Sequence, residues 1–201
     1  MAAPARAQQT NIASVIKLPA PQGEGELMRA LRARKSTRAF SPRPLSQDII
    51  GGLLWAAFGI NRPQTGGRTA PSAHGWQEID VYAAFADGAY RYDPHAHALT
   101  LAAPKDLRAL TGVQDFVGTA PLNLVYVADF ARMKDASEED RLFFVPADAG
   151  VIAQNVYLFC AANGLATVVR GLVNRKQLAP ALGLTREQRI ILAQSVGFPA
   201  G

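Results

Sequence analysis

Residues 146–162, with the sequence PADAGVIAQNVYLFCAA, decide the fold. Only Asp148, Gln154 and Asn155 interrupt the apolar run, so it predicts a central helix buried on nearly every side, compatible with one half of a subunit interface. Pro146 suits the first turn of a helix, and Gly164 lies just past the end. We therefore expect this helix to run from Pro146 through Ala162.

Strand signals flank this helix along the chain. Apolar positions alternate from Ile79 to Phe85, and Asp87-Gly88 then predicts a hairpin into residues 89–92. Leu122 to Ala128 is almost continuously apolar, as expected of a strand buried on both faces. Weaker patterns predict strands over 99–101, 165–169 and 190–196.

Helical signals are spread over the rest of the chain. A helix is expected from Glu26 to about Arg34, and a second one is capped by Ser46 and stopped at Gly59. The Gly51-Gly52 pair inside the second helix costs about 1 kcal/mol per residue relative to Ala, which favours tight packing against a neighbour. The remaining expectations are a long irregular loop over 61–75, short helices over 105–110 and 174–182, and a helical turn over 186–189. The mixture has no strict βαβ alternation and indicates an α+β fold.

The amino-acid composition indicates which classes of binding partner are expected for this protein. The 201 residues are 49% hydrophobic and 18% charged, which suits one globular domain. The net charge of +5 is modest, and the basic residues are dispersed except around 29–43, so no nucleic-acid partner is expected. No apolar run reaches the roughly 20 residues that cross a bilayer, so no membrane partner is expected either. The single Cys160 is expected to be a buried small hydrophobe.

Metal and hydrolase signals are weak. His95-x-His97 beside Asp93 lacks a distant third ligand, so we expect no metal site. Ser72 and His74 do not form a hydrolase dyad, because the strained Gly-x-Ser-x-Gly turn is absent. No dinucleotide-binding or Walker sequence is present, which disfavours a Rossmann dehydrogenase or a P-loop enzyme.

The segment after the first helix carries the clearest binding signal. Arg34-Lys35-Ser36-Thr37-Arg38 heads toward Pro42 and is expected to be extended, so Arg34, Ser36 and Arg38 share one face. Two guanidinium groups and a hydroxyl suit a phosphate group. The alternative is that these basic residues only offset the dipole at the helix end.

With this motif, the sequence resembles the FMN-dependent nitroreductase-like flavoproteins, in particular the branch that includes the azoline dehydrogenases of modified-peptide biosynthesis. Arg34, Ser36, Arg38 and Phe40 match the phosphate motif of that family. Residues 68–73, RTAPSA, match a loop that lies against the flavin across the dimer interface. Residues 148–165 match the long interface helix, and Val168-Val169-Arg170-Gly171 follows where the family places backbone amides near the flavin ring.

The resemblance implies the fold and the cofactor. It implies a three-layer α-β-α sandwich with a mostly antiparallel sheet, forming an intertwined homodimer with FMN sites built from both subunits. Residues 1–25 would be an N-terminal tail and 26–201 a single FMN-binding domain. The cofactor-binding residues would be Arg34, Lys35, Ser36 and Arg38 at the phosphate and ribityl chain, Pro71, Ser72, Ala73 and His74 from the partner subunit, and Val169, Arg170 and Gly171 beside the ring.

The implied activity is hydride transfer through flavin N5, from NAD(P)H or another donor to a small organic acceptor such as a nitroaromatic compound or a quinone. The flavin carries the chemistry, so no catalytic side chain is expected. Two alternatives stay open: a flavin-binding protein without turnover, and a dehydrogenase that acts on a modified peptide.

The sequence departs from the family pattern in two places. Many relatives have further basic residues after the last strand, whereas this chain ends at Gly201, and Arg68 or Arg170 would have to substitute. The azoline dehydrogenases use a Lys-Tyr pair, and this sequence contains no Lys-Tyr dipeptide. At the N-terminus, Ala5-Arg6-Ala7 has the form of a signal-peptidase site without the usual preceding regions, so a cytoplasmic and a periplasmic location are both open.

Overall fold

The computed structural model describes Val15 and residues 17–201, so Ala5-Arg6-Ala7 lies outside the described residues. Its centre is a six-stranded sheet in the order β5-β4-β3-β6-β8-β7, in which every neighbouring pair is antiparallel. The helices are α1 Glu26–Ala33, α2 Gln47–Phe58, α3 Glu138–Ala162 and α4 Arg175–Ala181. The strands are β1 Ile60–Arg62, β2 Gly67–Arg68, β3 Ile79–Ala84, β4 Ala89–Asp93, β5 Ala98–Ala103, β6 Leu122–Asp129, β7 Ala166–Arg170 and β8 Gln188–Gly197.

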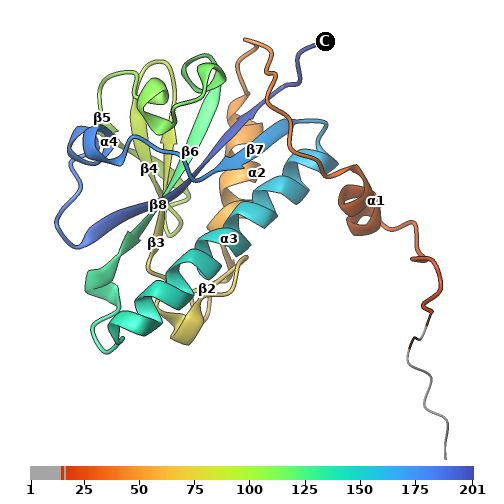
Figure 1. Cartoon of the computed structure of the whole chain (residues 1–201), viewed down its shortest axis with the longest axis horizontal. Coiled ribbons are helices and arrows are strands. Elements are labelled where there is room, and N and C mark those ends of the chain that lie inside the picture. The colour runs from red at the N-terminus through yellow and green to blue at the C-terminus, as the bar shows by residue number, and fades with distance from the viewer. Residues whose placement is uncertain (1–14, 16) are drawn as a thin grey trace, which may run out of the picture.

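Strand β6 shows why the sheet is covered on both faces. Its residues Leu122, Leu124 and Tyr126 pack in the core beneath α2 and α3, whereas Val125 and Val127 pack in the core that α4 covers. Alternate side chains of a strand point to opposite faces, so a nearly continuous apolar run requires a layer on each side. Figure 1 shows α2 and α3 on one side of the sheet and α4 on the other. The predicted α-β-α sandwich is confirmed.

Helix α3 is longer than predicted. It begins at Glu138 rather than Pro146, because Ser137 and Asp140 form a capping box at its N-terminus. Pro146 therefore lies inside the helix, where it removes the hydrogen bond to the Leu142 carbonyl. This position is exposed, so water can bind that carbonyl in place of the missing N–H. By length and composition α3 could cross a bilayer, but its buried face forms the core with the sheet and α2.

Three smaller expectations are corrected. The segment 61–75 is not wholly irregular, because β1 and β2 form a small antiparallel pair within it. The short helix over 105–110 is a 3₁₀ turn at Arg108–Thr111. The helical turn over 186–189 is a plain turn, and β8 already begins at Gln188 because it pairs with the end of β6 at Asp129.

The two glycines inside α2 have different surroundings. A Cβ at Gly52 would lie 3.2 Å from the ring of Phe159, so this glycine allows close packing of α2 on α3. A Cβ at Gly51 would be 3.5 Å from His97 Nε2, which is ordinary contact. The expected tight packing is confirmed at Gly52 alone.

This contrast predicts opposite effects of two alanine substitutions. Gly51→Ala is expected to raise the free energy of unfolding by up to about 1 kcal/mol, because alanine favours the helix and fits. Gly52→Ala should lower it, because the added methyl group presses on Phe159. Urea unfolding of both variants measures the difference. A stabilising Gly52→Ala would show that the α2–α3 contact is looser than described.

Candidate functional site

The segment after α1 is held beside the edge of the sheet. The Thr37 N–H donates to the Thr167 carbonyl (2.9 Å), and the Ser41 N–H donates to the Phe198 carbonyl (2.9 Å). Phe40 forms an antiparallel bridge with Pro199. These backbone contacts fix the predicted phosphate motif against β7 and the end of β8.

The side chains of this motif remain accessible. Arg34 is half-buried, and Lys35, Ser36 and Arg38 are exposed. Within the described part of the chain, no salt bridge joins Arg34, Lys35 or Arg38 to a carboxylate. Three uncompensated cations beside one serine make this segment attractive to an anion.

Tyr157 of α3 organises this segment and was not identified from the sequence. Its hydroxyl lies 2.7 Å from Ser36 Oγ and accepts the Val169 N–H at 3.0 Å. The Arg34 guanidinium lies over its ring, 5.3 Å from the centroid. Either hydroxyl can donate in the contact between Tyr157 and Ser36, and the Val169 N–H donates to the Tyr157 oxygen. A tyrosine in an otherwise apolar helix was the available signal, since a buried tyrosine hydroxyl usually has a partner.

Tyr157→Phe therefore gives a prediction for this site. Losing one hydroxyl removes two hydrogen bonds that hold Ser36 and Val169, and we expect FMN affinity to fall roughly tenfold. Fluorescence titration of FMN measures this change. Tyr92→Phe, which removes a hydroxyl bonded to His97 elsewhere, is the matched control. Equal affinity of wild type and Tyr157→Phe would contradict the role given to Tyr157.

Strand β7 presents its backbone to the same region. It is an edge strand, and its residues Thr167 and Val169 direct their backbone groups away from β8, toward Thr37 and Tyr157. Gly171 follows the last residue of β7 and is exposed. Of the predicted backbone donors, Val169 is thus already used by Tyr157 and Gly171 is accessible.

Arg170 does not turn its side chain toward this region. It is only 5% exposed, and it donates to the Thr111 carbonyl (2.6 Å) and to Asn123 Oδ1 (2.9 Å) beneath the opposite face of the sheet. Burial lowers the pKa of its guanidinium to about 10. Arg170 was expected beside the flavin ring, but its side chain points to the opposite face of the sheet. The reason is that consecutive residues of a strand point to opposite faces.

The Arg68 side chain also forms hydrogen bonds with nearby residues. Its guanidinium donates to Gln77 Oε1 (2.8 Å) and to the Phe58 carbonyl (3.2 Å), and it lies over the Phe58 ring. Burial lowers the pKa of this group. The side chains of Arg68 and Arg170 are therefore both engaged in contacts within the chain.

The loop over 71–74 lies against the N-terminal half of α3. The Ala73 N–H donates to Asp148 Oδ2 (2.8 Å), and the Ser72 hydroxyl donates to Glu78 Oε2 (3.2 Å). The His74 ring packs on Trp76 and Phe144. Asp148 precedes Tyr157 by nine residues, or about 13 Å along the helix. The 71–74 loop and the phosphate motif therefore contact α3 at points about 13 Å apart along the helix.

The outer face of α3 is apolar and uncovered. Between residues 142 and 151 every exposed position carries an apolar side chain or none, and Leu142 and Phe143 are 72% and 70% exposed. The exposed positions are Leu142, Phe143, Pro146, Ala147, Gly150 and Val151. Such a continuous patch is typical of a protein interface. We call it the α3 patch.

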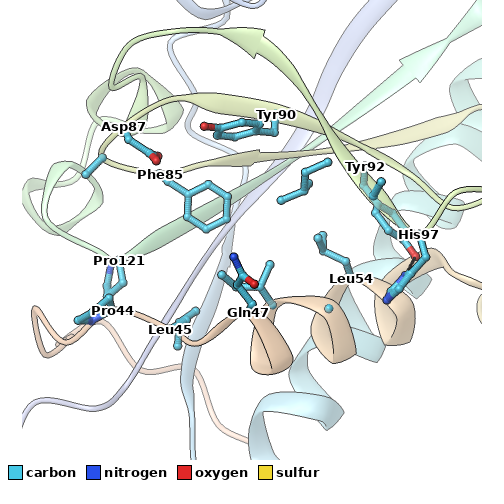
Figure 2. A pocket seen from close by; sticks show the side chains of 15 residues that line it. Pro44, Leu45, Gln47, Leu54, Phe85, Asp87, Tyr90, Tyr92, His97 and Pro121 are labelled. Atoms are coloured by element: carbon cyan, nitrogen blue, oxygen red, sulfur yellow. Dashed lines mark hydrogen bonds between the residues drawn. The ribbon is translucent and has the colours of Figure 1, made fainter.

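A cavity lies elsewhere. It has a volume of about 640 Å³ and opens between α2, the turn after β3 and the strands β4 and β5. Figure 2 shows Phe85, Tyr90 and Tyr92 above it, and Gln47 and Leu54 of α2 below it. None of the predicted cofactor-binding residues lines this cavity.

Histidine and cysteine groups have local partners. His97 Nδ1 lies 2.8 Å from the Tyr92 hydroxyl, and Asp93 accepts the backbone N–H of His95. Among the described residues, no group of three or more His, Cys, Asp or Glu is arranged to hold a metal. Cys160 is buried as predicted, and burial raises the pKa of its thiol to about 12.

Comparison with known proteins shows which family and fold the chain shares. Residues 31–198 match the model of the Nitroreductase family. A crystal structure of a protein named as a nitroreductase from Ralstonia eutropha JMP134 is 48% identical, covers 92% of this chain and 89% of its own chain, and superimposes with a TM-score of 0.84.

Two further structures share the fold at lower identity. The Escherichia coli microcin synthetase McbBCD complex, with truncated pro-MccB17 bound, matches with 20% identity and a TM-score of 0.75, over 96% of this chain and 77% of its own. A protein named as a nitroreductase from Desulfovibrio desulfuricans, in complex with FMN, matches with 23% identity and a TM-score of 0.65, over 89% of each chain.

Proposed function

Since the chain belongs to the nitroreductase family, whose members are oxidoreductases, we propose that it binds FMN and transfers hydride from a reduced nicotinamide to a small organic acceptor. The observation that carries this proposal is the set of uncompensated donors at residues 34–38. A structural neighbour that holds FMN in the same fold supports the choice of cofactor.

The donors present fit the phosphate end of FMN. Arg34 and Arg38 supply guanidinium groups without carboxylate partners among the described residues, and the exposed Ser36 adds a hydroxyl group. Lys35 adds a further accessible cation. Tyr157 holds Ser36 and β7 in a fixed relation, so the phosphate site and the edge of β7 form one rigid unit.

The protein's part in the reaction is binding and orientation. Bound FMN would supply the hydride acceptor and donor, so the chain needs no acid–base triad. The Gly171 N–H at the edge of β7 would donate a hydrogen bond to the ring and orient it. Donor and acceptor would use one open face in turn, which gives a ping-pong order. Nitroaromatic compounds and quinones are the proposed acceptors, and NADH or NADPH the proposed donor.

A homodimer completes the site in this proposal. The α3 patch is apolar and exposed, which suits pairing with a second copy. The 71–74 loop lies near Asp148, about 13 Å along α3 from Tyr157. In a dimer formed through α3, Pro71, Ser72, Ala73 and His74 would therefore contact the cofactor held by the partner subunit.

Two other functions make different predictions. A flavin-binding protein without turnover would hold FMN through the same residues and show no oxidation of NADH or NADPH. A dehydrogenase that acts on a modified peptide is supported by the fold likeness to the McbBCD complex. It is disfavoured because the sequence lacks the Lys-Tyr pair.

An absorbance experiment separates these functions. The purified protein is mixed with FMN, freed of unbound cofactor, and titrated with NADH or NADPH without oxygen. Bleaching of the flavin band, followed by its return on adding a quinone, supports the oxidoreductase. Retained flavin that neither nicotinamide bleaches supports binding without turnover, and no retained flavin contradicts the proposal.

A further inference from the structure

A pair of buried acids lies behind the 71–74 loop. Glu78 is completely buried at 0% exposure, and Asp148 of α3 is 7% exposed. Both carboxyl groups bind adjacent residues of one loop, because Glu78 Oε2 accepts from Ser72 and Asp148 Oδ2 accepts from Ala73. Asp148 is close enough to raise the pKa of the Glu78 carboxyl. The sequence did not predict that these two acids lie close together, because they are seventy positions apart.

One oxygen of this pair has no partner unless a proton is present. Glu78 Oε2 accepts from the Ser72 hydroxyl, but Glu78 Oε1 is buried without a hydrogen bond among the described residues. Two ionised carboxylates only accept, so they repel each other and leave this oxygen unsatisfied. A single proton between them turns the contact into an O–H···O hydrogen bond and removes one buried charge.

Among the described residues, no salt bridge joins Glu78 or Asp148 to a basic side chain. Arg68 and Arg132 bind other groups: Arg68 donates to Gln77 Oε1, and Arg132 donates to the Gln77 carbonyl and Asp80. The His74 ring packs on Trp76 and Phe144. From β6, only the backbone N–H of Asp129 reaches Glu78, and it donates to the Glu78 carbonyl. Burial raises the pKa of the Glu78 carboxyl, and the neighbouring Asp148 raises it further.

The pair is connected to the loop at two points. Asp148 Oδ2 accepts the Ala73 N–H (2.8 Å), and Glu78 Oε2 accepts from Ser72 (3.2 Å). Ser72 Oγ also accepts the Gln77 N–H (2.8 Å). His74 in the loop and Gln77 just after it have positive φ, 52° and 49°. Such backbone is kept only where neighbouring contacts hold it.

We propose that Glu78 and Asp148 share one proton, and that this shared proton holds the Pro71–His74 loop in the position from which it contacts the partner's cofactor. The role of the loop rests on the function proposed above, whereas the proton itself does not. Glu78 and Asp148 are positioning residues in this account. Loss of the proton leaves two buried like charges in contact, which releases Ser72 and Ala73.

Infrared spectroscopy of the cofactor-free protein tests the proton. The wild type is expected to keep a protonated-carboxyl band at a pH above the ordinary pKa of glutamate. The band should disappear in Glu78→Gln, whose amide imitates the protonated acid. Glu139→Gln, at an exposed glutamate of α3, is the matched control and should keep the band. If Glu78→Gln does not fold, Asp148→Asn gives the same test, because its amide can donate to Glu78. A band unchanged in the folded variant overturns the proposal.

Amide hydrogen exchange tests the link to the loop. Between about pH 5 and about pH 9, protection of the Ala73 and Gln77 amides should fall roughly tenfold in the wild type, beyond the chemical effect of pH. The folded state binds this proton more tightly than the unfolded state, so stability declines as pH rises through the raised pKa. Glu78→Gln should show neither change. Equal pH dependence in wild type and Glu78→Gln overturns the proposal.

Titration with FMN distinguishes failure of the shared-proton proposal from failure of the proposed function. If FMN binds, its affinity should weaken with pH in the wild type and stay constant in Glu78→Gln, and a parallel decline in both overturns the role of the loop. If FMN does not bind at any pH, the proposed function fails, and the infrared band and the exchange data still decide whether the proton is shared.

Discussion

Replacing Arg34 and Arg38 together by alanine is expected to abolish retention of FMN through gel filtration. Each guanidinium would contribute a charge-assisted hydrogen bond to the phosphate, worth about 1.5–3 kcal/mol, so the pair accounts for at least a hundredfold in affinity. The fold should survive, because neither side chain forms a salt bridge among the described residues. Fluorescence titration with FMN gives the dissociation constant.

A matched control separates the local effect from net charge. Arg186→Ala removes an exposed arginine from the turn before β8, far along the chain from the motif. This variant should bind FMN like the wild type. Titration with riboflavin, which lacks the phosphate, adds a second check, because the double variant and the wild type should bind it equally. Unchanged FMN affinity in the double variant would place the phosphate elsewhere.

Ala147→Glu is expected to separate the subunits. Ala147 lies within the α3 patch, and glutamate is a good helix former, so the monomer should fold. Burying an unpaired charge in the interface costs about 3 kcal/mol or more, which raises the dimer dissociation constant at least a hundredfold. Light scattering with gel filtration measures the mass. Retention of FMN should decrease as the dimer dissociates, because each subunit then loses the 71–74 loop of its partner.

Gln177→Glu is the control for this experiment. It adds the same charge to an exposed position of α4, on the other side of the sheet. It should remain a dimer that retains FMN. If Ala147→Glu still forms dimers of full FMN affinity, the interface does not include the α3 patch. If the wild type is a monomer that binds FMN, the proposed origin of the 71–74 contacts is wrong.

Local patterns were sufficient for most of the fold. Leu122 to Ala128 predicted a doubly covered strand because its apolar run is continuous, and Ser46 and Gly59 marked the ends of α2. The central helix was predicted to begin at Pro146, which resembles a first-turn proline, and Glu138-Glu139-Asp140 was interpreted separately as a solvated helix start. The structure shows that both belong to one helix, α3. The exposed side of the helix tolerates the lost hydrogen bond, and only the three-dimensional position of Pro146 reveals this.

The candidate site was only partly predictable. Arg34, Ser36 and Arg38 follow one another in the sequence, so their alternation could be recognised directly. Tyr157 and Ser36 are 121 positions apart, and Glu78 and Asp148 also meet only through the fold. The direction of the Arg170 side chain depended on the register of β7, which sequence patterns do not specify. Contacts between polar residues that are far apart in the sequence therefore could not be predicted from sequence patterns.

A crystal structure of the protein grown with FMN tests the central claim most directly. We expect the phosphate to lie within hydrogen-bonding distance of Arg34, Ser36 and Arg38. The flavin ring should lie beside Gly171, and the 71–74 loop of a second copy should contact the ring. A phosphate bound away from these residues, or an FMN site built from a single chain, would contradict it.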